Sequence, residues 1–203
     1  MMPRQSAMRH VVLPFLLFAA TACATEAAST RETPAVPPDS RPAAIDLASR
    51  TGLVYAAVLH QLVEVDHGYG NAPSPYRRVY VIDGAVPHAA DVRGGAGFRR
   101  VAHPFDAGVK QRITQRLDGA RPLVFVRSRA EVIGGRTSRS PGEVMDRGVL
   151  VTLGPVKWIN GGTARVANNR WAAGKDGQWL VYTVKLRHGH WRVAGIHGAV
   201  TIS

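Results

Sequence analysis

The stretch GVLVTLGPVKWINGGTARVANNRWAAGKDGQWLVYTVKLRHGHWRVAGIHGAVTIS, residues 148–203, decides the fold. Its residues are rich in β-branched and aromatic types, and they fall into four runs: Val149–Trp158, Thr163–Trp171, Gln178–Arg187 and Trp191–Ile202. Short glycine-bearing segments separate the runs, at residues 160–162, 174–177 and 188–190. Connections of this length and composition are typical of β-hairpins. The pattern predicts a four-stranded antiparallel meander at the C-terminal end of the chain.

The third run shows which face of this sheet is buried. Side chains alternate between the two faces of a strand, so residues two apart share a face. One face of the run carries Leu180, Tyr182, Val184 and Leu186, and it is the more apolar of the two. We expect this face to pack on helices.

Two helices are predicted upstream of the meander. Apolar residues recur at helical spacing between Leu47 and Val63. A second helix is indicated by Asp106 as N-cap, an apolar stripe at helical spacing, and Gly119 just past the end. Short strands are expected at 78–82 and 123–126, and the polar, glycine-rich residues 127–147 are expected to form a loop. Helices followed by an antiparallel meander indicate an α+β domain.

This arrangement resembles the NTF2-like fold, in which a curved antiparallel sheet closes over N-terminal helices to form a cone. The segments GVLVTLGP at 148–155, WLVY at 179–182, GHWRV at 189–193 and the closing Ile202-Ser203 are also similar to a pattern in uncharacterised exported bacterial proteins. NTF2-like relatives range from enzymes to non-catalytic binding and assembly domains. The resemblance therefore implies two N-terminal helices on a curved sheet, and no particular activity.

The first 22 residues have the composition of a secretory signal peptide. Arg4 and Arg9 precede a short apolar run, which is too short to span a bilayer. The segment AATAC at 19–23 resembles the lipobox of bacterial lipoproteins, in which the cysteine becomes the lipid-bearing N-terminus. This predicts lipidation of Cys23 and attachment to the outer face of the cell membrane. The alternative is ordinary cleavage, which leaves a secreted soluble protein.

The sequence predicts three parts: a signal peptide at 1–22, a lipidated Cys23 with a tether to residue 43, and one α+β domain at 44–203. Residues 24–43 are rich in Ala, Ser, Thr and Pro and have almost no large apolar side chains. Such a segment buries too little apolar surface to offset its ordering entropy.

Charge is distributed unevenly along the 203 residues, whose net charge is +12. Residues 24–92 hold 5 basic and 8 acidic residues, whereas residues 93–203 hold 19 and 6. A basic exported domain is expected to meet lipid head groups or an acidic envelope polymer. Nucleic acid is not expected as a partner, because export would separate the protein from nucleic acid and the sequence has no recognised nucleic-acid motif. The alternative is a solvated arginine-rich surface that reflects genome composition.

The sequence contains no nucleophile elbow, P-loop, dinucleotide fingerprint or zinc-ligand spacing. No cofactor or metal is therefore expected, and His188 and His190 are interpreted as residues of a turn. The catalytic candidates are His60, Asp66 and His197, because a histidine near a carboxylate can act as a general base. The alternative for these residues is a structural role at the helix end and in loops.

The candidate ligand-binding residues are Trp179, Tyr182 and Trp191, since aromatic rows can line a ligand pocket. Core packing is the alternative for all three. The sequence favours a lipid-anchored, non-catalytic envelope protein that binds a ligand or partner. The alternatives are a small NTF2-like enzyme with acid–base residues in its cone, and a secreted module that forms a homodimer through its sheet.

Overall fold

A computed structural model describes residues 47–92, 101, 103–117, 121–135, 137 and 142–203. These residues all belong to one compact unit, Ala43–Ser203. The predictions for the signal peptide, Cys23, the tether and the helix end at Gly119 lie outside the described residues.

The helical elements occupy the first half of the unit. Helix α1 spans Leu47–His60 and continues as a π-helical turn, Gln61–Val65, and helix α2 spans Ala107–Leu117. The strands are β1 Arg78–Ile82, β2 Leu123–Val126, β3 Ile133–Gly134, β4 Glu143–Val144, β5 Gly148–Asn160, β6 Thr163–Ala173, β7 Asp176–Arg187, β8 His190–Ile196 and β9 Thr201–Ile202. Two 3-10 turns lie at Arg129–Glu131 and Met145–Arg147.

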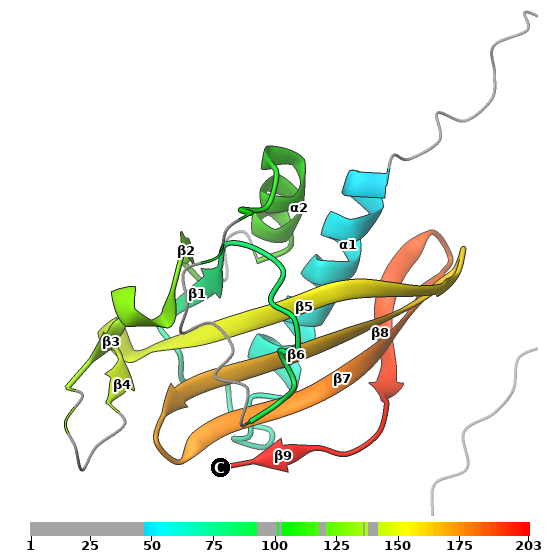
Figure 1. The fold of residues 1–203 in the computed structure, drawn as a ribbon. Helices are drawn as coiled ribbons and strands as arrows, with labels where there is room; N and C mark the ends of the chain where they lie inside the picture. Colours follow the sequence, from blue (N-terminus) through cyan, green and yellow to red (C-terminus); the bar gives the residue numbers. More distant parts are fainter. Residues whose placement is uncertain (1–46, 93–100, 102, 118–120, 136, 138–141) are drawn as a thin grey trace, which may run out of the picture. The chain divides into compact units, whose positions relative to one another are not determined.

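The strands form one mixed, open sheet, which confirms the α+β class (Figure 1). Strands β5, β6, β7 and β8 are consecutive and antiparallel, as the meander prediction required. The expectation of a wholly antiparallel sheet was wrong, because β1 pairs in parallel with both β2 and β5. Helix α2 lies between β1 and β2 in the chain, as parallel neighbours require a crossover connection.

The segment 127–147 also differs from the predicted loop. It contains β3, β4 and the two 3-10 turns, and β4 pairs with the end of β6 at Glu143 and Ala173. The last predicted strand is interrupted after Ile196, and β9 then pairs separately with β7. Strands of two residues carry too little hydrophobic pattern to be recognised in a sequence.

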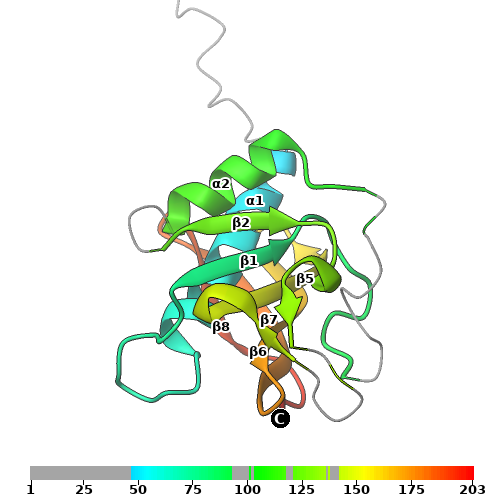
Figure 2. The same ribbon diagram turned by 90° about the vertical axis from the view of Figure 1, so that its left-hand side faces the viewer.

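Both helices lie on one face of the sheet, where the larger core forms (Figures 1 and 2). Leu180, Tyr182 and Val184 belong to this core, which confirms the predicted apolar face of β7. Leu186 is an exception, at 43% exposed. From α1, Val58 and Leu59 are fully buried in the same core. Side chains therefore fill the space between the helices and the sheet.

A second, smaller core lies on the other face of the sheet. Trp171 and Trp179 are buried there with Tyr80, Ile82 and Leu150. Both faces of the central strands are thus covered. Strands β5 to β7 accordingly show only a partial alternation of hydrophobic and polar residues. The loop residue Val86 helps to cover this face, and its backbone N–H donates to the Leu153 carbonyl at 2.8 Å.

Helices α1 and α2 approach closely at Gly52. A Cβ atom added to this glycine would lie 2.9 Å from the Arg112 Cβ and 3.1 Å from the Val109 Cα. The glycine therefore fixes the distance between the two helices, and with it the position of the α2 arginines over α1.

Candidate functional site

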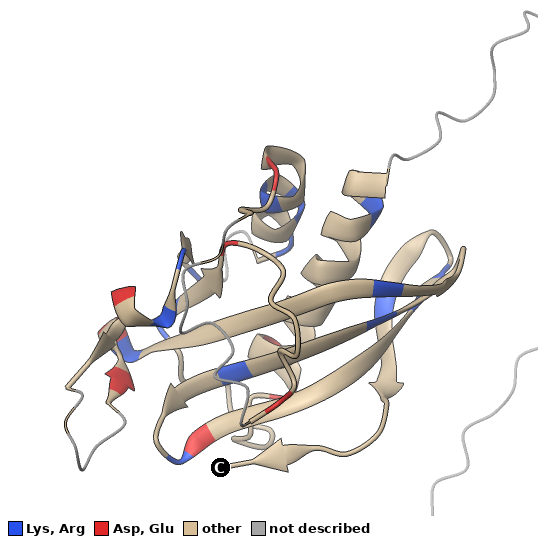
Figure 3. Cartoon of the chain, in the orientation of Figure 1, with Lys and Arg blue, Asp and Glu red and all other residues tan. Residues whose placement is uncertain are grey.

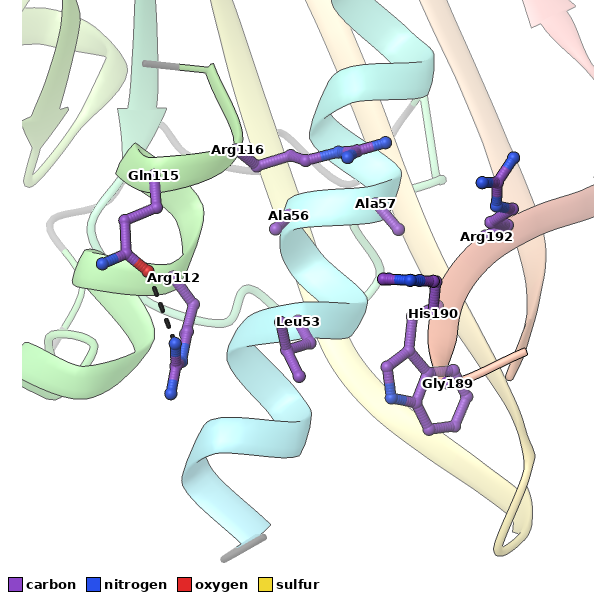
Figure 4. A pocket seen from close by; sticks show the side chains of 10 residues that line it. Leu53, Ala56, Ala57, Arg112, Gln115, Arg116, Gly189, His190 and Arg192 are labelled. Carbon is purple, nitrogen blue, oxygen red and sulfur yellow. Dashed lines mark hydrogen bonds between the residues drawn. The ribbon is translucent and has the colours of Figure 1, made fainter. Parts of the chain in front are cut away.

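A pocket opens between α1, α2 and the start of β8 (Figure 4). Its volume is about 340 Å³. Helix α1 contributes the small, apolar floor, chiefly Ala56 and Ala57. Arg116 reaches from α2 over α1, and His190 reaches toward α1 from the β8 side. The pocket therefore combines an uncharged floor with walls that carry nitrogen donors.

Basic residues gather around this pocket. Arg112 and Arg116 of α2 line it, Arg192 of β8 lines both it and a neighbouring hollow, and Arg187 of β7 lines that hollow. We call these four residues the cationic end. Figure 3 shows further basic positions at the start of α1 and along the strands that lead into the two hairpins.

The cationic end is not neutralised within the part of the chain that the structure describes. The described ion pairs involve Arg78, Lys110, Arg121 and Arg170, and none involves the four arginines of the cationic end. Lys185 lies directly opposite Arg192 on the neighbouring strand. Like charges in directly opposed strand positions destabilise a sheet. An external anion would relieve this repulsion.

His60 lies at the end of α1 near the pocket and is half-buried. Burial lowers the pKa of His60, the positive charge of Arg116 lowers it further, and Glu64 opposes the change. Glu64 is itself held by Arg121, through contacts of 2.8 and 3.2 Å. His60 is therefore predominantly neutral at pH 7, and the neighbouring Glu64 carboxylate is engaged by Arg121. A catalytic role for His60 stays a prediction.

Asp66 follows the π-helical turn and is brought together with Tyr182, another sequence candidate. The Tyr182 hydroxyl donates to Asp66 Oδ2 at 2.5 Å, and the Gln61 side chain donates to the same oxygen at 3.1 Å. Burial raises the pKa of Tyr182, and the hydrogen bond to the Asp66 carboxylate adds to the increase. The pair joins the end of α1 to the sheet, and its phenol remains protonated at physiological pH.

Beside this pair lies a buried ionic network that the sequence reasoning missed. Arg170 donates to Asp176 at 2.5 Å and to the Tyr76 hydroxyl at 2.6 Å. The hydroxyls of Tyr69 and Tyr76 both donate to the Asp176 carboxylate. The Arg170 side chain is only 4% exposed. The network fastens the loop after α1 to strands β6 and β7, a structural role.

The remaining candidates are dispersed. His197 is exposed after β8, and its backbone N–H donates to the Val181 carbonyl at 2.7 Å. Trp179 is buried in the smaller core. Trp191 is also buried, lines the pocket, and packs edge-on against Trp158 with ring centroids 5.5 Å apart. His60, Asp66 and His197 do not line the pocket, and of the three aromatic candidates only Trp191 does.

The C-terminal strands expose apolar side chains, namely Ile196, Val200 and Ile202. This is the region that a homodimer through the sheet would use, and the homodimer stays a prediction. Within the described ranges, no three His, Cys, Asp or Glu side chains are grouped to hold a metal ion. No helix in those ranges is long and apolar enough to cross a bilayer.

No family model, curated protein or solved structure matches the chain. The function therefore has to be argued from the site itself. The signal in the sequence that could have found the cationic end is the excess of 19 basic over 6 acidic residues after position 92. The sequence does not show which of these basic residues come together.

Proposed function

We propose that this protein is an exported, lipid-anchored, non-catalytic domain that binds an anionic component of the cell envelope at its cationic end. The observation that carries the proposal is the group Arg112, Arg116, Arg187 and Arg192, which has no carboxylate partner among the described residues. Arginine is well suited to phosphate and carboxylate groups because its planar guanidinium presents several donors in a fixed geometry.

The position of α1 supports a role near the membrane. The Arg50 side chain, in the first turn of α1, donates to the Gly161 carbonyl at the tip of the β5–β6 hairpin, at 2.7 Å. Leu186 of the next hairpin donates its backbone N–H to the Gly162 carbonyl at 2.9 Å. The chain therefore enters the domain at the end where the hairpins lie (Figure 1). The first turn of α1 thus lies at the end of the domain where β7 ends, which carries Arg187.

The packing of the helix face supports a binding role over catalysis. An enzyme of the NTF2-like type would use the space between helices and sheet as its pocket. Here Tyr55, Leu59 and Leu62 fill that space and are at most 2% exposed. The NTF2-like cone itself is part of this proposal. It is supported by two helices on one face of the β5–β8 meander, and an experimental structure would test it.

Vesicle binding tests the cationic end. The chain from Ala24 onward retains the whole compact unit, and we expect it to sediment with vesicles of phosphatidylglycerol and phosphatidylcholine but not with phosphatidylcholine alone. Each basic residue near an anionic surface contributes about 1 kcal/mol. Replacing the four arginines of the cationic end by Gln should therefore weaken binding roughly a thousandfold.

The matched control removes four positive charges elsewhere. Arg77, Arg127, Arg147 and Lys175 are exposed and lie outside the cationic end, so their replacement by Gln should weaken binding much less. Equal losses in the two variants would show that only net charge matters, and the proposal would then fail.

Lipidation is tested separately, by mass spectrometry of the mature N-terminus from membrane and culture fractions. We expect a diacylglyceryl-modified Cys23 in the membrane fraction. An unmodified soluble chain that begins near residue 23 would refute the anchor and favour the secreted alternative.

A further inference from the structure

The tips of the β5–β6 and β7–β8 hairpins lie side by side at one end of the sheet (Figure 1). A two-residue loop closes each tip, at 161–162 and at 188–189. The Leu186 backbone N–H donates to the Gly162 carbonyl at 2.9 Å, which joins the second hairpin to the tip of the first. Both tips are therefore held in place by the sheet itself.

Each tip exposes one large apolar side chain. Ile159 is 48% exposed and Leu186 is 43% exposed. Leu47, at the start of α1, is also exposed, and it shares a helix face with Arg50. The Arg50 side chain donates to the Gly161 carbonyl of the first tip. Apolar side chains that are exposed together, rather than singly, mark a surface that contacts a partner or a membrane.

Basic residues flank the exposed apolar side chains of both tips. Residues 157–165 and 184–193 contain no Asp or Glu and five Lys or Arg, namely Lys157, Arg165, Lys185, Arg187 and Arg192. None of the five takes part in an ion pair among the described residues. Lys157 lies opposite Arg165, and Lys185 lies opposite Arg192, on neighbouring strands. An anionic surface near the tips would relieve this repulsion between like charges.

A bilayer with anionic head groups matches both the charge and the apolar side chains of the tips. Its head groups attract the positive charges, and the boundary between head groups and acyl chains takes up apolar side chains. A soluble anionic polymer offers charge alone and would leave Ile159 and Leu186 in water. The long side chains of Lys157 and Lys185 can extend their charged ends toward the head groups beside an inserted tip.

We infer that the two hairpin tips dock on an anionic bilayer, with Ile159 and Leu186 inserted at this boundary and the flanking basic residues on the head groups. Because the sheet already holds the tips in place, docking does not have to order their backbone. This inference rests on the proposed function and deepens it, since it names the bilayer as the anionic component and names the part of the domain that enters it.

Sedimentation with vesicles tests the insertion when the variants keep the charge of the parent. In the chain from Ala24 onward, Ile159→Gln and Leu186→Gln should each weaken binding to phosphatidylglycerol vesicles about fivefold, because each forfeits burial of roughly half an apolar side chain. Ile202→Gln is the matched control, since Ile202 is 72% exposed and pairs with Gln178. Gln178 lies eight residues before Leu186 on β7, about 26 Å along the strand. The control should bind like the parent.

A fluorescent label reports directly whether the tip enters the bilayer. Cys23 is the single cysteine of the sequence, so the chain from Ala24 carries none. An environment-sensitive label on Ile159→Cys should brighten and shift to shorter wavelength when phosphatidylglycerol vesicles are added. The same label on Ile202→Cys should not change. Thermal unfolding establishes that each variant is folded.

The outcomes separate the insertion from the proposed function. If the parent binds vesicles but the two Gln variants at the tips bind equally well, or the label at 159 stays in water, the insertion is refuted and binding by charge stands. If the parent binds soluble polyphosphate but not vesicles, the partner is a polymer and the insertion alone is refuted. If replacing the four arginines of the cationic end has no effect while the tip variants still lose binding, the cationic end is refuted and the tips remain the membrane contact.

Discussion

Replacing Gly52 by Ala sets two known effects against each other. Alanine is favoured over glycine in a helix interior by about 1 kcal/mol, so a free helix would gain stability. In this protein the new Cβ would lie 2.9 Å from the Arg112 Cβ and 3.1 Å from the Val109 Cα. Neither atom is the end of a flexible side chain, so α2 must move away from α1.

Overpacking of this kind costs about 1–3 kcal/mol, and the displaced helix also loses contact at its buried stripe. Because the steric cost exceeds the gain in propensity, we expect Gly52→Ala to lower the free energy of unfolding by about 1–2 kcal/mol. For a domain of this size the melting temperature should fall by roughly 3–6 °C.

The assay is urea and thermal unfolding followed by circular dichroism. Gly108→Ala is the control, because its Cβ would meet only the Asp106 Oδ1 at 3.3 Å. That variant should be neutral or slightly stabilised. A Gly52→Ala protein as stable as the parent would refute the reasoning, since it would mean that the close approach of the helices is not rigid.

Three further perturbations probe the packing. Arg170→Leu removes a buried cation and leaves the partly buried Asp176 carboxylate without it, so the free energy of unfolding should fall by about 3 kcal/mol in urea titration; an unchanged midpoint would show that the network is not stabilising. Burial raises the pKa of Tyr55 to about 12. The contribution of the protonated Tyr55 to the free energy of unfolding is therefore complete below pH 10 and is lost as the pH rises toward 12. Stability should therefore fall by up to about 1.4 kcal/mol per pH unit for this tyrosine, and Tyr55→Phe should reduce that slope. Trp158→Ala removes the edge-on contact with Trp191 and should cost about 2 kcal/mol by thermal unfolding, whereas a loss below half of that would contradict the assigned packing.

Local patterns account for the parts of the fold that the sequence predicted. The alternation of Leu180, Tyr182 and Val184 identified the buried face of β7 because side chains in a strand alternate strictly. The start of α2 was predictable from Asp106, whose Oδ1 accepts the Val109 backbone N–H at 2.7 Å. Both signals lie within a few residues of the structure that they determine.

The features that the sequence did not predict depend on residues far apart in the chain. Strand β1 pairs in parallel with β5, which begins about 70 residues later, and nothing in either strand specifies that partner. Arg116 and Arg192 each read as an ordinary exposed arginine in its own segment. Only the packing of β8 beside α1 brings both residues to the lining of one pocket. The charge excess in the sequence therefore indicated that a ligand would be anionic, but not where it would bind.

The pairing of β1 with β5 also affects how the chain folds while it is being made. Arg78 is paired with Gly148, so the ribosome must add about 70 residues before β1 has its second neighbour. At roughly 5–20 residues per second, that interval is on the order of 4–14 s. Throughout it the apolar stripes of α1 and α2 lack the β5–β7 strands that bury them. The larger core therefore cannot be completed before the C-terminal third of the chain is available to it.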